Sequence, residues 1–169
     1  RGSNAAVVYA TTEPQEALLL GDYTATLWQG RVTQFGRSAE VYRRPHDLNT
    51  ARIFSDPPLN LLPVAKRGAM ILLPGGESAP ATGALAGLAD GDYQLGFRAH
   101  HLALRPVSPA SLPFEATVTV SEITGSESFV HVACGDANWV ALVQGVHELA
   151  PGSAVTVHVD PARVFVFEA

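Results

Sequence analysis

The chain has 169 residues, of which 47% are hydrophobic and 16% are charged, enough to form a packed core in one or two domains. Its formal net charge of −5 argues against wholesale binding of nucleic acid, which requires a basic surface. No apolar run approaches the roughly 20 residues of a membrane-spanning helix. The single cysteine, Cys134, excludes an internal disulfide.

The first part of the chain begins with a strand pattern followed by a helix pattern. Residues 7–10 are apolar, as in a strand that is covered on both faces. Thr12 with Gln15 three residues later predicts a capping box, and the helix it opens ends at Gly21. A strand of this kind needs neighbours, so the pattern indicates the last piece of a larger sheet.

A hairpin and two short helices are predicted next. Two strands turn at Gln29-Gly30. One helix begins at Ser38 or slightly upstream and stops before Pro45, and Asp47 caps another. We expect the nearby arginines to form a solvated helix surface rather than a phosphate site; they are Arg37, Arg43, Arg44 and Arg52.

The pattern of predicted helices and strands changes at Pro57 and Pro58, which cannot continue a helix. We therefore predict two domains, residues 1–55 and residues 56–169. The second shows seven to nine short strand patterns, typical of a small barrel or sandwich. In one of them, residues 114–120 alternate, with Phe114, Ala116, Val118 and Val120 facing the core. Residues 74–92 are rich in small residues and are predicted to be a mobile loop.

A series of segments, in order, resembles the carboxy-terminal part of ABC importer ATPases of the maltose type, which take up carbohydrates. The first segment matches that family's Thr-His-Asp-Gln-x-Glu-Ala pattern, and the later ones are a Gly-Arg hairpin turn, a Gln-x-Gly and a short helix. The matching residues are Thr11, Glu16, Ala17, Gly30-Arg31, Gln34, Gly36, Glu40, Tyr42 and Pro45. Three further segments resemble the family's regulatory domain: "FSDPPLN", "GFRAHHL" and the pair "EITGSESFVHV" and "DPARVFVF".

The resemblance implies a mainly β fold: a small OB-like barrel or sandwich preceded by an α/β remnant of a nucleotide-binding domain. It implies a carboxy-terminal fragment whose regulatory domain dimerises with its twin or with a second ATPase subunit. The transmembrane permease would be the other partner, at the cytoplasmic face of the inner membrane, and the solute a sugar, polyol or similar compound. ATP and Mg would serve the full-length protein. This fragment has only Gly75-Gly76 in place of a phosphate-binding loop, so we expect no ATP hydrolysis by it alone.

Thr12 occupies the position of the family's histidine, which reaches the γ-phosphate. A threonine hydroxyl is shorter and uncharged and cannot replace an imidazole. One interpretation is a degenerate site that works beside an intact ATPase in a heterodimer. The other is that Thr12 is simply a helix cap and that upstream groups compensate.

The remaining candidates are weaker. Arg98 is the best single candidate for an anion or carboxylate ligand, although a salt bridge to Asp92 or Glu122 would explain it as well. His100 and His101 are adjacent, so on a strand they would point to opposite faces and share no metal. We assign no catalytic and no metal-binding residue. An alternative function is a sensor of a small oxyanion or sugar, since related folds bind molybdate.

Overall fold

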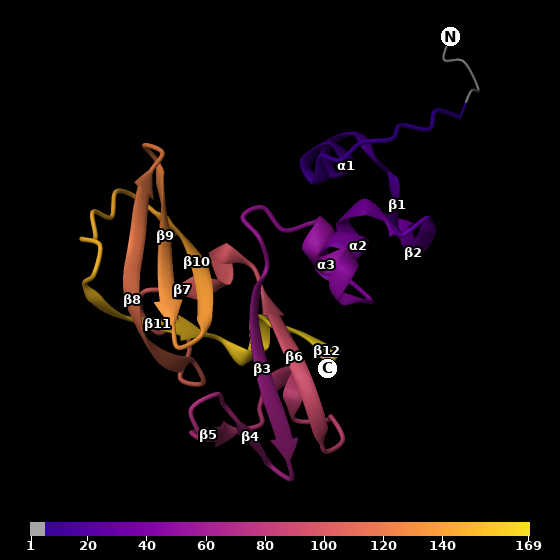
Figure 1. The fold of residues 1–169 in the computed structure, drawn as a ribbon. Coiled ribbons are helices and arrows are strands. Elements are labelled where there is room, and N and C mark those ends of the chain that lie inside the picture. The colour runs from indigo at the N-terminus through magenta and orange to yellow at the C-terminus, as the bar shows by residue number, and fades with distance from the viewer. Residues whose placement is uncertain (1–5) are drawn as a thin grey trace. The chain divides into compact units, whose positions relative to one another are not determined.

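The computed structural model describes residues 6–169, and the chain divides into two compact units, Arg1–Phe54 and Ser55–Ala169 (Figure 1). The first unit contains three short helices and one hairpin. Its elements are α1 (Pro14–Leu20), β1 (Tyr23–Trp28), β2 (Arg31–Arg37), α2 (Ser38–Arg43) and α3 (Leu48–Ile53). The second unit holds all other strands. Its first strand begins three residues after Pro57, which follows a cis peptide bond.

The hairpin in the first unit is confirmed at the predicted turn. Strands β1 and β2 are antiparallel, and Trp28 is opposite Arg31. The two turn residues both have positive φ, 49° at Gln29 and 76° at Gly30. Two-residue hairpin turns of this type favour glycine because it adopts this backbone conformation without a steric cost.

Of the two predictions for the start of the chain, the Thr12 cap is wrong, and the strand at residues 7–10 stays a prediction because its expected partners belong to a larger sheet. Residues 7–10 pair with no strand among the described residues, and Val7 and Val8 are 87% and 95% exposed. A strand needs a neighbour for its backbone groups. Thr12 does not cap α1, because Pro14 takes the first helical position and makes Glu13 the N-cap residue, without a side-chain cap bond.

Hydroxyl groups link the hairpin to α3. The Thr50 hydroxyl lies 3.1 Å from that of Thr26 and 3.0 Å from that of Thr33. Asp47 caps α3 as predicted, because its Oδ1 accepts a 2.9 Å bond from the Thr50 amide. Its Oδ2 accepts a second bond from the Thr50 hydroxyl. The buried hydroxyls of Thr26 and Thr50 are therefore both paired.

The second unit is built from ten antiparallel strands in two five-stranded sheets (Figure 1). One sheet has the order β12-β6-β3-β4-β5 and the other the order β10-β9-β8-β11-β7. The strands are β3 (Asn60–Arg67), β4 (Met70–Leu72), β5 (Ser78–Pro80), β6 (Gly91–Phe97), β7 (Leu102–Ala103), β8 (Leu112–Ile123), β9 (Glu127–Cys134), β10 (Ala137–Gln144), β11 (Ala154–Val159) and β12 (Phe165–Glu168). This is the mainly β, OB-like fold that was predicted, with more strands because β5 and β7 are too short to show alternation.

One hydrophobic core lies between the two sheets. Its largest member is Trp139, which is 2% exposed and packs edge-on against Phe97 and Phe114 with ring centroids 5.2 Å away in each case. The Trp139 ring also donates a 2.9 Å hydrogen bond to the Leu61 carbonyl. Asn60 completes this link: its amide donates to the Val140 carbonyl at 2.9 Å and accepts from the Val140 amide at 2.8 Å. Strands β3 and β10 are therefore joined by side chains.

Two local predictions in the second unit are wrong. Residues 74–92 do not form one loop, because they contain β5 and a 3₁₀ turn, η1 (Gly83–Leu85), whose Leu85 is fully buried in the core. Along β8 the alternation holds only to Val118. A bulge between Val118 and Val120 shifts the register, and Val120 is 46% exposed instead of buried.

Candidate functional site

The loop before α1, which carries Thr12, is organised by its neighbours. The Thr11 hydroxyl donates a 2.5 Å hydrogen bond to Glu16 Oε2 and accepts a 2.9 Å bond from the Glu13 amide. Glu16 lies in the first turn of α1, so its carboxylate reaches back to the residue before Thr12. Thr12 itself is exposed at the tip of the loop.

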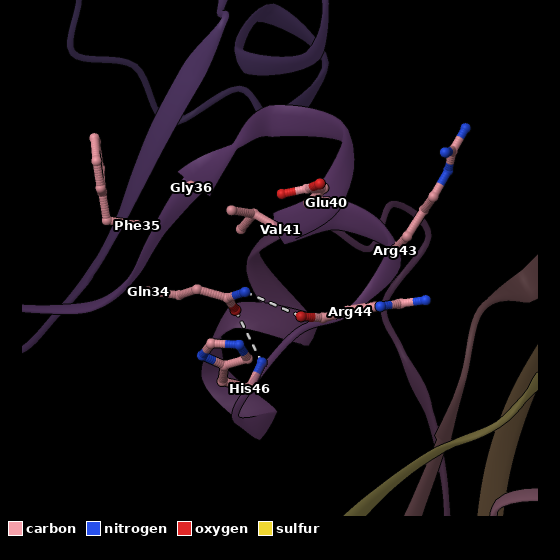
Figure 2. Close-up of a pocket in the computed structure, with 8 residues that line it drawn as sticks. All are labelled: Gln34, Phe35, Gly36, Glu40, Val41, Arg43, Arg44 and His46. Carbon is pink, nitrogen blue, oxygen red and sulfur yellow. Dashed lines mark hydrogen bonds between the residues drawn. The ribbon is translucent and has the colours of Figure 1, made fainter.

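Gln34 lies behind a shallow pocket in the first unit, lined by β2, α2 and the loop after it (Figure 2). Gln34 is 7% exposed, and both polar atoms of its side chain form hydrogen bonds to backbone groups. Nε2 donates to the Arg44 carbonyl at 3.0 Å, and Oε1 accepts from the His46 amide at 2.8 Å. In Figure 2 the side chains of Arg43 and Arg44 point outward, away from Phe35. The pocket brings no acid, base and nucleophile together, and all four arginines named above are exposed, as expected for a solvated surface.

The outer face of the hairpin is apolar and exposed. We name it the hairpin face; its members Tyr23, Leu27, Val32 and Phe35 are 56%, 61%, 60% and 69% exposed. The rings of Tyr23 and Phe35 stack with centroids 5.7 Å apart, and the guanidinium of Arg37 lies 5.4 Å from the Tyr23 centroid. Soluble domains seldom leave such a continuous apolar surface uncovered unless it is an interaction surface. Sequence reasoning missed it, although the alternation in "YTATLW" was the available signal.

Basic side chains gather around a second 3₁₀ turn, η2 (Ala99–His101), in the other unit. Arg98 precedes the turn, is 5% exposed, and places its guanidinium 4.8 Å from the Phe165 ring centroid. Of the acids considered as its partners, Asp92 bonds Arg67 at 2.9 Å and Glu122 lies 3.5 Å from His131.

The prediction that His100 and His101 point to opposite faces is wrong, because they lie on a turn and not on a strand. Their ring centroids are 4.3 Å apart. Burial, together with the charges of His100, Arg98 and Arg163, lowers the pKa of His101 to about 4. Burial and the same arginines also lower the pKa of His100. At neutral pH these rings are therefore uncharged and lie beside permanent cations.

The cysteine and the metal candidates do not form a reactive centre in the described part of the chain. Burial raises the pKa of the Cys134 thiol, which disfavours the thiolate. Residues 6–169 contain no group of three or more His, Cys, Asp or Glu side chains placed to hold a metal ion.

Comparison with known proteins places these observations in a family. A family profile described as "TOBE domain" matches residues 95–167, from β6 through β12. The second unit carries a TOBE domain. The match includes the η2 turn with Arg98, His100 and His101.

Two curated relatives extend the match over both units. The chain is 32% identical over 163 residues to the sn-glycerol-3-phosphate import ATP-binding protein UgpC of Ruegeria sp. (strain TM1040), covering 95% of this chain and 44% of the relative. It is 28% identical over 167 residues to the sulfoquinovosyl glycerol transport ATP-binding protein SmoE of Agrobacterium fabrum (strain C58 / ATCC 33970), covering 96% of this chain and 46% of the relative. The chain is thus related to ATP-binding subunits of ABC importers and spans less than half of their length.

A solved structure supports the fold of the TOBE unit. The cytoplasmic molybdate-binding protein ModG matches with a TM-score of 0.50 and 20% identity, covering 65% of this chain and 96% of ModG. At this identity the likeness shows the fold alone.

Gly75 and Gly76 do not form a phosphate-binding loop. Gly75 and Gly76, with φ of 95° and 89°, lie in the turn between β4 and β5, and the chain continues into a strand. A phosphate-binding loop instead runs into a helix and ends with Lys followed by Ser or Thr. The only lysine of the chain, Lys66, is 4% exposed and bonds the Gly68 carbonyl. No helix among the described residues exceeds seven residues, far short of the roughly 20 that a membrane span requires.

Proposed function

We propose that this chain is the carboxy-terminal part of an ATP-binding subunit of an ABC importer, and that its TOBE domain regulates the subunit by pairing with a second ATPase subunit. The relatives support this proposal because they match both units in order and continue well beyond them. The names of these relatives refer to glycerol-3-phosphate and to sulfoquinovosyl glycerol, which supports a polyol- or sugar-derived solute. ATP and Mg are then handled by a part of the protein outside these residues, and permease subunits hold the assembly at the cytoplasmic face of the membrane.

The hairpin face is the structural observation that carries the proposal. A unit of about fifty residues buries too little apolar surface to be stable alone with its largest side chains exposed. The exposed apolar residues 7–9 and Leu19 and Leu20 of α1 add to this surface. If the first unit is the end of a nucleotide-binding domain, the rest of that domain covers this surface and supplies the strands beside residues 7–10.

The coding region upstream of Arg1 tests this proposal directly. We expect it to encode a Gly-x-x-x-x-Gly-Lys-Ser/Thr loop, a Leu-Ser-Gly-Gly-like segment and an apolar strand that ends in Asp-Glu. An upstream region without these segments would contradict the proposal and leave the TOBE unit as a stand-alone module.

The second part of the proposal rests on Thr12 and concerns an asymmetric pair of ATPase subunits. Thr11, Glu13 and Glu16 hold the loop in place, but the group at its tip is a hydroxyl with no imidazole function. We propose that this subunit turns over ATP poorly by itself and works beside an intact partner.

The measurement is ATP turnover by the isolated full-length subunit as wild type, Thr12→Ala and Thr12→His. We expect low turnover that is unchanged in Thr12→Ala and rises in Thr12→His. Substantial turnover that Thr12→Ala abolishes would contradict the asymmetric arrangement, while leaving the family assignment intact.

A second candidate function is an oxyanion sensor, and the basic side chains around η2 favour it. Arg98 and Arg163 both act on His100 and His101, so their charges reach the same small region. An anion bound there would be attracted by both arginines. Thermal unfolding with molybdate, phosphate and sulfate, compared with sugars and nucleotides at equal ionic strength, tests this candidate. A rise in Tm with one oxyanion that Arg98→Gln removes would support a sensor, and equal Tm values throughout would favour a pairing module.

A further inference from the structure

One face of the TOBE unit breaks the usual rule for a sheet surface. In β9 and β10 the residues that face away from the core include Phe129 and His131, which are directly opposite Leu142 and Val140. None of these side chains belongs to the hydrophobic core between the sheets. An antiparallel sheet with one solvated face normally alternates apolar inside with polar outside, so this outer face is unusual for a surface that only meets water.

The bulge in β8 extends the same face. Without the bulge Val120 would point into the core with Val118, but the register shift places Val120 opposite His131 on the outer side. Bulges frequently re-aim a side chain at a functional surface. Glu122, next along the face, is opposite Phe129 and lies 3.5 Å from the His131 ring. We call this set the outer patch: Val120, Glu122, Phe129, His131, Val140 and Leu142.

The segment that carries the outer patch has charges of one sign. Residues 106–162 contain no lysine or arginine, but they contain six acids, Glu115, Glu122, Glu127, Asp136, Glu148 and Asp160. Three of these acids border the outer face of the sheet, because Glu115 is opposite Thr156, Glu122 opposite Phe129 and Glu127 opposite Gln144. Fixed negative charge on these strands disfavours nucleic acid and anionic membrane surfaces.

The same charge disfavours a second copy of this chain as the occupant. In a two-fold pair each patch would face its own image, and the acids of both copies would be brought together without a basic partner. A partner with apolar side chains in the centre of its contact surface and lysines or arginines at the rim would match both the apolar residues and the acids of the outer patch.

We propose that the outer patch docks a basic, amphipathic segment of another protein. This interaction goes beyond the pairing role proposed above and does not involve the nucleotide chemistry assigned to the rest of the subunit. The apolar residues supply the contact area, and the flanking glutamates select a cationic partner and favour its approach.

The test uses the isotope-labelled full chain and two synthetic helical peptides. One peptide carries Leu and Phe along one face and Lys along the other; the second is identical except that Glu replaces every Lys. We expect the basic peptide to shift the backbone amide signals of Phe129, His131, Val140 and Leu142, more weakly as salt is raised, and the acidic peptide to leave them in place.

Charge reversal gives the decisive comparison. Glu122→Lys combined with Glu127→Lys should weaken binding of the basic peptide about tenfold. The same double variant should bind the acidic peptide at the same residues. The matched control is Glu77→Lys, in the turn before β5, with Glu168→Lys in β12. It changes the net charge equally at the other sheet and should leave binding of both peptides unaffected. Retained amide dispersion shows that each variant is folded.

Three results would overturn the proposal. These are peptide-induced shifts spread over the whole acidic surface, equal weakening by the control variant, and self-association of the chain that protects the outer patch. The last would make a second copy the occupant.

Discussion

At the residue scale, Asn60 decides how the two sheets of the TOBE unit are joined. It is 3% exposed and satisfies both backbone groups of Val140, a residue of the edge strand β10. Asn60→Leu keeps the branched shape of the side chain but leaves the Val140 amide and carbonyl without partners. We expect a loss of about 2–3 kcal/mol in the free energy of unfolding, measured by urea denaturation. Asn138→Ala, an exposed change on the same strand, should cost less than about 0.5 kcal/mol; equal losses would show that the link carries no stability.

The lowered pKa of His101 predicts that the stability of the folded chain depends on pH. This pKa is about 4 in the folded protein, against an ordinary value of 6.5 for the unfolded chain, so between these values the unfolded chain binds the proton that the folded chain rejects. Stability therefore falls as the pH is lowered from about 6.5 to about 4. His101→Gln, which cannot titrate, should flatten urea midpoints across this window, whereas exposed His46→Gln should not. A slope unchanged by His101→Gln would mean that other groups cause the acid sensitivity.

At the element scale, the sequence predicted structure where one residue type imposes a local conformation. Gly30 allowed the turn and Asp47 specified the cap of α3, and both are confirmed. Prediction failed where distant packing decides. Leu85 is buried within a run of small residues that carries no hydrophobic period, and Val120 is turned outward by a bulge that depends on its partner strand. The candidate sites divide in a similar way. Arg98 and Thr12 were named from motifs, the hairpin face was missed although its alternation is visible in the sequence, and the outer patch needed the strand register.

The cap of α3 gives a prediction for that element. Asp47→Ala removes the acceptor for the Thr50 amide and for its buried hydroxyl. We expect a local loss of about 1 kcal/mol, seen as about fivefold faster amide hydrogen exchange over α3. Glu13→Ala is the matched control, because Glu13 is the N-cap of α1 but makes no side-chain cap bond. Equal effects of the two changes on their own helices would contradict the role of the Asp47 carboxylate.

At the scale of the whole molecule, three surfaces are available for self-association: the amino-terminal apolar segment, the hairpin face and the TOBE unit. The first two expose large apolar side chains, including Val8 at 95% and Phe35 at 69%. Sheet edges and apolar faces that have lost their neighbours readily join other copies. A dimer of this chain in solution therefore has to be assigned to one surface before it is taken as evidence of TOBE pairing.

Sedimentation velocity on three forms makes the assignment: the full chain, the chain lacking residues before Tyr23, and Phe35→Lys. We expect association of the full chain to weaken in Phe35→Lys, because a desolvated ammonium against Tyr23 and the facing copy is costly. Loss of the dimer only on deletion would place the contact in the deleted segment. A dimer that survives both changes would contradict this expectation and leave the TOBE unit and the α2–α3 region as the candidate pairing surfaces.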